Sequence, residues 1–288
     1  MSLLASLPQE LIWVIFAFAF LYGAIFGSFS SVLVSRIHSK KQWIFLGRSA
    51  CPDCGHMLHI WDLFPIFSYA LLRGKCRYCH KKIPITYFLL EISGWILAVI
   101  FAYTLLSRSQ TFNELIFGSI VAVGAIITML TYTLYDYLYL EIPDEILIPV
   151  VLFLLWMLVA STHILHIDWI YHIPMNFPYD SPLANGTLGA LVIFSFFMIQ
   201  ILISGGKWMW WWDLRIALFL GLLLGFKSTL IALFFAYISG SIIGVILMFT
   251  TKKSAQSQIP FWPFLTIWIA CALALSPTIV PMFLPSSL

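Results

Sequence analysis

Charged residues are scarce in this 288-residue chain, where Asp, Glu, Lys and Arg make up 9% and hydrophobic residues 61%. A soluble globular domain carries about 25% charged residues. The composition therefore excludes a water-soluble fold and indicates a protein whose main solvent is lipid. A basic leading segment is also missing before the first hydrophobic stretch, residues 11–34, which is too long for a cleavable signal peptide. We interpret that stretch as a membrane span.

Hydrophobic segments follow one another along most of the chain, and each is about as long as the roughly 20 residues that a span requires. The sequence predicts an all-α polytopic membrane protein of about eight transmembrane helices. The predicted spans are residues 11–35, 87–107, 114–135, 145–163, 187–204, 214–226, 229–250 and 260–284. The sixth is short, and Lys227-Ser228 is its only separation from the seventh. Three regions are expected: the first helix (1–35), a polar loop domain (36–86) and a seven-helix membrane domain (87–288).

Basic residues are distributed very unequally between the two sides of these spans. Of the 15 Lys and Arg residues, 13 lie on the side of residues 36–86, and only Arg108 and Lys227 lie on the other. Positive residues stay on the cytoplasmic side, so the polar loop is predicted to be cytoplasmic. The first and last residues of the sequence then face away from the cytoplasm.

The polar loop contains two CxxC pairs, Cys51-Pro-Asp-Cys54 and Cys76-Arg-Tyr-Cys79, separated by 21 residues. Two facing CxxC turns form a tetrahedral site with four sulfur ligands, which suits zinc. Gly55 lets the chain turn away with a positive φ. Because four thiolates leave no open coordination position, we expect a structural zinc site that folds the loop.

The three histidines of the loop and the fifth cysteine are not expected to bind the metal. His56, His59 and His80 are expected to be surface residues, and Cys271 in the last span is expected to pack against its neighbours. A redox role for one CxxC pair is the alternative to zinc binding.

Only 12 acidic residues are present, and ionisable groups near membrane spans are costly and tend to be functional. Asp136 ends the third span and Asp213 precedes the sixth, both at the cytoplasmic face. Two carboxylates that meet from separate helices share a proton, as in aspartic proteases. The alternative is structural, with Asp213 as a helix N-cap. Asp144 and Glu145 are expected to stabilise the start of the fourth span.

The motifs together resemble the type IV prepilin peptidases, a family of membrane aspartyl proteases that also N-methylate the new pilin N-terminus. The resemblance covers nearly the whole chain. It rests on the following segments: Gly27-Ser28-Phe29 with Arg36, residues 48–55 around the first CxxC pair, Trp61-Asp62 with Pro65, residues 72–79 around the second pair, Tyr87 to Glu91, Asp136 with Ile142-Pro143-Asp144, and residues 259–264. The role of Glu91 stays open.

The resemblance implies an activity, a substrate and a methyl donor. Asp136 and Asp213 would be the catalytic pair. The substrate would be a prepilin or pseudopilin with a short basic leader, a glycine before the cut and a hydrophobic helix after it. S-adenosylmethionine would donate the methyl group, although no glycine-rich nucleotide fingerprint is present. The protein would lie in the bacterial inner membrane with its active site on the cytoplasmic side, contacting lipid and no nucleic acid.

The chain departs from the family pattern at several positions. Trp210-Trp211-Trp212 precede Asp213 where the family has Gly-x-Gly, Trp262 stands where a glycine is usual, and Ser31 replaces an asparagine. The tryptophans before Asp213 are expected to form an aromatic belt at the membrane interface.

Three other functions are compatible with parts of the sequence. They are a catalytically altered scaffold for pilus assembly, a membrane thiol oxidoreductase that uses the CxxC pairs, and an ion-coupled transporter that uses the aspartates. Transporters usually place such groups near the bilayer midplane, whereas Asp136 and Asp213 lie at the ends of their spans.

The predicted orientation is testable with a fusion protein. A reporter that is active only in the cytoplasm should be silent when fused after Leu288 and active when inserted at Gly55, because the basic residues hold the loop inside. Activity of the fusion after Leu288 would show that the number of spans is wrong by one.

Overall fold

The computed structural model describes residues 2–39, 47–165, 181–206, 211, 213–251 and 260–283 of the chain. Within these ranges nearly all regular structure is helical, and the only β pairing is two isolated bridges. In chain order the elements are α1 (Leu3–Ser6), α2 (Gln9–His38), η1 (Ile60–Asp62), α3 (Phe67–Leu71), α4 (Ile85–Arg108), α5 (Phe112–Tyr139), α6 (Asp144–Ala160), η2 (Ser161–Leu165), α7 (Pro182–Ser204), α8 (Asp213–Thr251) and α9 (Trp262–Phe283). The predicted all-α class is confirmed.

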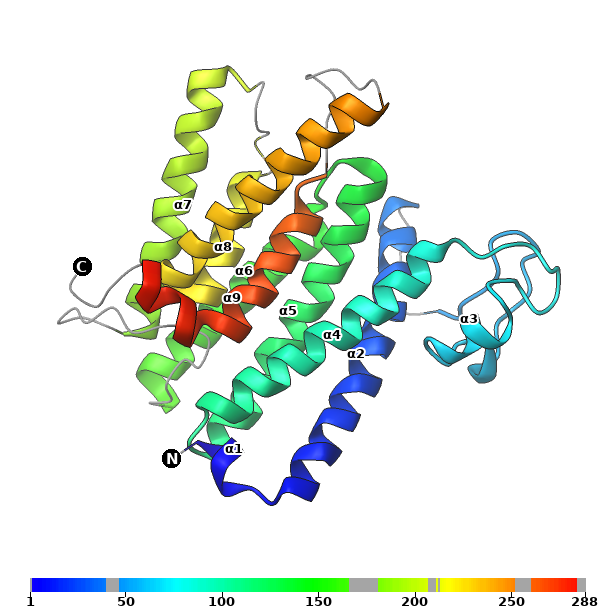
Figure 1. Ribbon diagram of the computed structural model, residues 1–288, viewed down its shortest axis with the longest axis horizontal. Coiled ribbons are helices and arrows are strands. Elements are labelled where there is room, and N and C mark those ends of the chain that lie inside the picture. Colours follow the sequence, from blue (N-terminus) through cyan, green and yellow to red (C-terminus); the bar gives the residue numbers. More distant parts are fainter. Residues whose placement is uncertain are drawn as a thin grey trace.

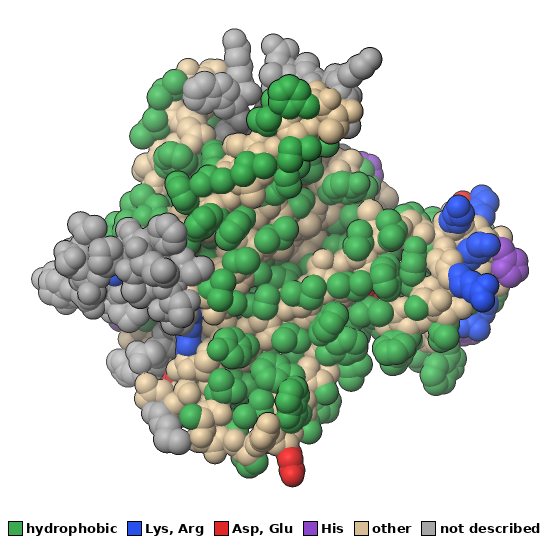
Figure 2. Space-filling view, in the orientation of Figure 1, with side chains coloured by type: hydrophobic (Ala, Val, Ile, Leu, Met, Phe, Trp, Pro, Cys, Tyr) green, Lys and Arg blue, Asp and Glu red, His purple; other side chains and the backbone are tan. Residues whose placement is uncertain are grey.

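Six of the described helices, α2 and α4 to α8, are long and apolar enough to cross a membrane, and the start of α9 forms a shorter apolar helix. The long helices lie side by side, and the polar loop between α2 and α4 projects beside their ends (Figure 1). Lys and Arg side chains gather on this loop, whereas hydrophobic side chains cover the visible helices (Figure 2). The protein is thus a multi-pass membrane protein.

Helix α8 contains the boundary that was predicted between the sixth and seventh spans, but the break lies at Gly225 and not at Lys227-Ser228. Gly225 has φ 71° and ψ 179°, a conformation that glycine adopts without a steric penalty. Phe219, before the break, contacts Trp262, the first residue of α9, and Tyr237, after it, contacts Phe261, the residue before α9. In a straight helix Phe219 and Tyr237 would be about 27 Å apart. The two limbs of α8 therefore fold back on each other, as the predicted pair of segments required.

The neighbouring helix α7 supplies a hydrogen-bond acceptor for the backbone N–H that follows the break at Gly225. The side-chain Oδ1 of Asn185, which is buried, accepts a hydrogen bond of 2.8 Å from the backbone N–H of Phe226. A Cβ atom on Gly221 would overlap the backbone of Ala190, so the missing side chain allows α7 and α8 to touch. Buried backbone groups in a membrane need such internal partners, and Asn185 stabilises the reversal by supplying one.

Helices α2 and α4 also cross with their backbones in contact. Gly23 and Gly27 are four residues apart on α2, and a Cβ atom on either would overlap a carbonyl group of α4. Gly94 of α4 faces Gly23 in the same way. Small residues at this spacing are a common interface between membrane helices. The crossing places the first turns of α4 beside the middle of α2, where Ser28 lies.

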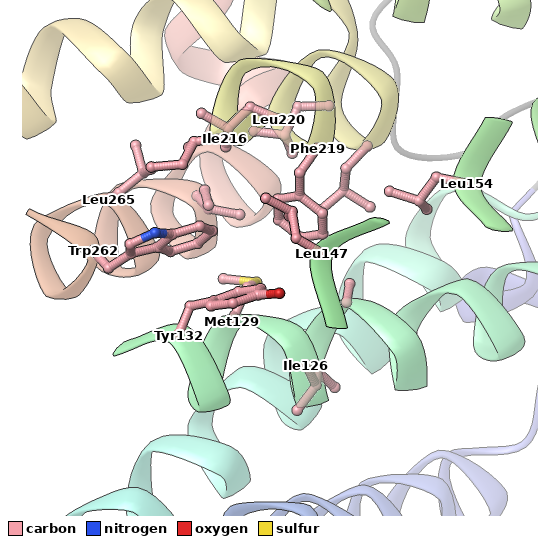
Figure 3. Close-up of a cluster of buried hydrophobic side chains, with 14 of the residues drawn as sticks. Ile126, Met129, Tyr132, Leu147, Leu154, Ile216, Phe219, Leu220, Trp262 and Leu265 are labelled. Atoms are coloured by element: carbon pink, nitrogen blue, oxygen red, sulfur yellow. The ribbon is translucent and has the colours of Figure 1, made fainter. Parts of the chain in front are cut away.

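The core that positions the acidic residues joins α5, α6, α8 and α9 around one aromatic side chain. Trp262 at the start of α9 is 1% exposed, and its ring stacks on Tyr132 of α5 with centroids 5.2 Å apart. Phe219 of α8 lies on the other side, with its centroid at 6.1 Å (Figure 3). Leu147 of α6 closes the cluster (Figure 3). The start of α9 is therefore held against the last turns of α5.

The close contact of α2 and α4 predicts different effects for two glycine substitutions. Gly94→Ala should lower the thermal unfolding midpoint in detergent, at a cost of about 1–3 kcal/mol, because the new methyl group forces the helices apart. Gly124→Ala is the matched control, since its Cβ would lie 3.6 Å from Phe153, an ordinary contact. Equal midpoints for both variants and the wild type would contradict the close contact.

Candidate active site and metal centre

The four loop cysteines meet in one cluster. Their sulfur atoms all lie within 4.8 Å of one another, and Cys51 Sγ lies 3.9 Å from Cys79 Sγ. A tetrahedral site with metal–sulfur bonds of about 2.3 Å has sulfur atoms roughly 3.8 Å apart. The cluster could therefore hold a metal ion, and its donor set is compatible with zinc.

The two CxxC turns have matching backbone structure. Gly55 N–H donates to Cys51 carbonyl oxygen at 2.9 Å, and His80 N–H donates to Cys76 carbonyl oxygen at 3.0 Å. The predicted positive φ of Gly55 is confirmed at 68°, and His80 takes the same role in the second turn with φ 58°. One short bridge flanks each turn, Ala50 with Met57 and Lys75 with Lys82. This repeated geometry aims both thiol pairs at one point.

Hydrogen bonds in the second CxxC turn favour the thiolate form of one cysteine. The backbone N–H groups of Cys79 and Tyr78 lower the pKa of Cys76 to about 7. The thiolate is the form that binds metals, so Cys76 is prepared for coordination by its own turn.

The surface of the loop is held by polar contacts rather than by a core. Arg77 Nε donates to Asp62 Oδ1 at 2.6 Å and Tyr78 hydroxyl donates to Asp62 Oδ2 at 2.9 Å. Lys81 pairs with Asp53 at 2.9 Å. His56, His59 and His80 are exposed and lie outside the sulfur cluster, as predicted.

Asp136 occupies the last turn of α5 and is 9% exposed. Its Oδ2 accepts a hydrogen bond of 2.8 Å from the backbone N–H of Trp262, the first residue of α9. Asp213 is the first residue of α8, and its charge is close enough to act on Asp136. The structure thus places the two predicted carboxylates, from separate helices, within electrostatic range of each other.

Asp144 forms an ion pair that the sequence alone did not predict. Its carboxylate forms an ion pair with Arg215, two residues after Asp213. This pair links the first turn of α6 to the first turn of α8. Asp144 and Glu145 do lie in the first turn of α6, as expected. The only sequence signal for the ion pair was the position of Arg215 close to Asp213.

The tryptophans at positions 210–212 and 262, where the chain departs from the pattern that it resembles, differ in their surroundings. Trp262 fills the core with its ring while its backbone N–H still reaches Asp136. Trp211 is 58% exposed, whereas Trp210 and Trp212 lie outside the described residues. The aromatic belt predicted for all three stays a prediction.

The fold and the two sites define a multi-pass helical membrane protein with an acidic pair at helix ends and a four-cysteine loop that could bind a metal. Residues 21–105 match the family model of the bacterial peptidase A24 N-terminal domain.

Curated relatives extend the match beyond that domain. The chain is 26% identical over 297 residues to the prepilin leader peptidase/N-methyltransferase of Aeromonas salmonicida, which covers 94% of each chain. It is 28% identical over 279 residues to the protein of that name from Pseudomonas aeruginosa, covering 87% of each. The protein of that name from Burkholderia pseudomallei is 26% identical over 273 residues, covering 86% of this chain and 82% of its own. No solved structure matches. These findings confirm the resemblance to the type IV prepilin peptidase family.

Proposed function

We propose that this protein cleaves the leader peptide of type IV prepilins or pseudopilins and N-methylates the new N-terminus. The similar proteins from three genera carry the name of both activities. The observation that supports the peptidase assignment is that Asp213, at the start of α8, lies within electrostatic range of Asp136 in the last turn of α5.

Asp136 and Asp213 would divide the work of an aspartic protease. Two neighbouring carboxylates share one proton because like charges in contact are not both ionised. The ionised group would activate a water molecule, and the protonated group would donate to the carbonyl oxygen of the scissile peptide bond. The N–H of Trp262 holds one oxygen of Asp136 and so fixes the orientation of that carboxylate before substrate binds.

The position of the pair suits a substrate that enters from the membrane surface. Asp136 lies in the last turn of α5 and Asp213 at the start of α8. The basic-residue distribution supports a cytoplasmic location for these helix ends, and the resemblance implies a bacterial inner membrane. A prepilin would keep its hydrophobic helix in the bilayer and present its basic leader and cleavage site at this surface.

The alternative functions have less support. A thiol oxidoreductase needs one CxxC pair that cycles between dithiol and disulfide, whereas here four thiols converge within 4.8 Å, a donor set for a metal. A transporter would place its carboxylates near the midplane. An inactive scaffold would not need two acidic groups within electrostatic range of each other, and a cleavage assay distinguishes it directly.

The metal of the loop would be zinc, bound by Cys51, Cys54, Cys76 and Cys79 in a structural role. Four sulfur ligands complete a tetrahedral shell and leave no position for substrate. Because the short loop elements η1 and α3 offer little core, metal binding would supply much of the loop's folding free energy.

The catalytic pair is tested by replacing each carboxylate with an amide. Asp136→Asn and Asp213→Asn should each reduce cleavage of a purified prepilin by on the order of 10³-fold or more, because neither water activation nor carbonyl polarisation then has its acid–base group. Cleavage is followed by mass spectrometry of the product.

The matched control is Glu10→Gln, which removes an exposed acidic group on α2 and should leave cleavage unchanged. If Asp136→Asn is inactive while Asp213→Asn cleaves at the wild-type rate, the pair is misassigned and Asp144 becomes the next candidate.

The zinc site is tested by elemental analysis. The wild-type protein should contain about one zinc per chain, and Cys51→Ser should lose it and make the loop sensitive to proteolysis. Cys271→Ser, which removes a cysteine far from the cluster in sequence, should retain the metal. A zinc-free wild-type protein with a protease-resistant loop would exclude this assignment.

A further inference from the structure

A cavity of about 310 Å³ lies between α2, the four-cysteine loop and the first turns of α4. Its lining does not include Asp136 or Asp213. The peptidase mechanism therefore leaves this cavity, and the residues that line it, without a role.

Glu91, for which the sequence alone indicates no role, lines this cavity. It lies in the second turn of α4 and is 8% exposed. Its Oε2 accepts a hydrogen bond of 2.7 Å from the backbone N–H of Ile66, and the Ser28 side chain also hydrogen-bonds to the carboxylate. None of the three ion pairs found among the described residues includes Glu91. A buried carboxylate held only by neutral donors is suited to a cationic ligand.

The rest of the lining has a different chemistry. Arg36 and Arg48 contribute guanidinium groups, and the Arg36 side chain donates to the carbonyl oxygen of Gly47 at 2.9 Å. Tyr69 and Phe88 contribute aromatic rings that stack with centroids 4.9 Å apart. Asp53 and Asp62 also line the cavity, and each forms an ion pair with a basic side chain of the loop. The cavity thus combines carboxylates, basic groups and flat apolar surfaces.

We propose that this cavity binds S-adenosylmethionine, with Glu91 facing its cationic sulfonium and amino groups. The guanidinium groups match the carboxylate of the ligand's amino-acid part, and the aromatic surfaces match its adenine ring. The ligand's three chemical groups therefore each have a counterpart in the lining. The proposal deepens the proposed function and rests on its methylating half.

The ligand would supply an electrophilic methyl group on a positively charged sulfur. In the transfer, the lone pair of the neutral N-terminal amine forms the new N–C bond while the S–C bond breaks. The electron pair of that bond stays on sulfur and leaves the neutral thioether of S-adenosylhomocysteine. The amine's proton passes to solvent water. Glu91 would hold the sulfonium cation in place and distinguish the donor from its product, whose sulfur is neutral.

The cavity and the carboxylate pair lie close enough to serve one substrate in succession. His38 at the end of α2 stacks on Tyr139 of α5, with centroids 3.8 Å apart. Tyr139 is three residues beyond Asp136, and Arg36 of the cavity is two residues before His38. A pilin N-terminus released at the aspartates would thus meet the methyl donor at the same membrane surface.

An alternative interpretation is that the cavity holds the basic leader of the prepilin. Its lining has five basic residues against three acidic ones, and this excess of positive charge would repel a basic peptide. The amino-acid part of S-adenosylmethionine carries both charges, so it matches a lining that has both.

The experiment measures binding of S-adenosylmethionine and S-adenosylhomocysteine to the purified full-length protein by equilibrium dialysis, without prepilin. Wild-type protein should prefer the charged donor. Glu91→Gln should weaken binding of S-adenosylmethionine by at least about tenfold, and that of S-adenosylhomocysteine by a smaller factor, because the product keeps the amino group but lacks the sulfonium charge. Glu10→Gln is the matched control and should bind both ligands as the wild type does.

A second variant blocks the cavity without touching Glu91. Ser35 is exposed on α2 and lines the cavity, so Ser35→Trp should reduce binding of both ligands while the loop keeps its metal. If Glu91→Gln loses the metal, its weaker binding could come from a disrupted loop. The binding measured with Ser35→Trp then tests the proposal. Wild-type affinity in Ser35→Trp, or an unchanged ligand preference in a metal-loaded Glu91→Gln, would overturn the proposal. Absence of binding in the wild type would instead contradict the methylating half of the proposed function.

Discussion

The hydrogen bond from Trp262 N–H to Asp136 Oδ2 is the contact on which the arrangement of the acidic residues depends. It joins the end of α5 to the start of α9, and the buried Trp262 ring reinforces it by packing between Tyr132 and Phe219. Since Phe219 belongs to the first limb of α8, the same aromatic cluster also positions the helix that begins with Asp213. One backbone donor and one indole ring thus help to position both carboxylates.

The reversal of α8 at Gly225 is the second requirement of this arrangement. Without it, the helix would carry the chain away from α9 instead of returning to it. The reversal exposes a backbone N–H inside a membrane protein, and Asn185 of α7 accepts its hydrogen bond. The tight contacts of Gly189 and Gly221 with the facing helix bring α7 close enough to do so. The polar residue and the two glycines therefore act as a unit, even though they lie on different helices.

The N-terminal part of the protein is organised by a similar close contact. The glycines of α2 and α4 let the two backbones touch, and this contact places Ser28 beside Glu91. The loop is joined to the same place by the hydrogen bond from Ile66 N–H to Glu91. A carboxylate inside a helix pair is thereby shared between the membrane part and the four-cysteine loop, which explains why the cavity forms at their junction.

Much of the protein could be predicted from local sequence properties. Hydrophobic length indicated the helices, the CxxC spacing indicated the sulfur cluster, and the motifs indicated the resemblance to the prepilin peptidases. These features depend on residues that are near one another in the chain. The contacts Asp136–Trp262, Asp144–Arg215 and Asn185–Phe226 join residues far apart in sequence, and hydrophobicity and spacing do not report which helix faces which. Only tertiary packing decided them, because the partner of a buried polar group is chosen by the helix that packs against it.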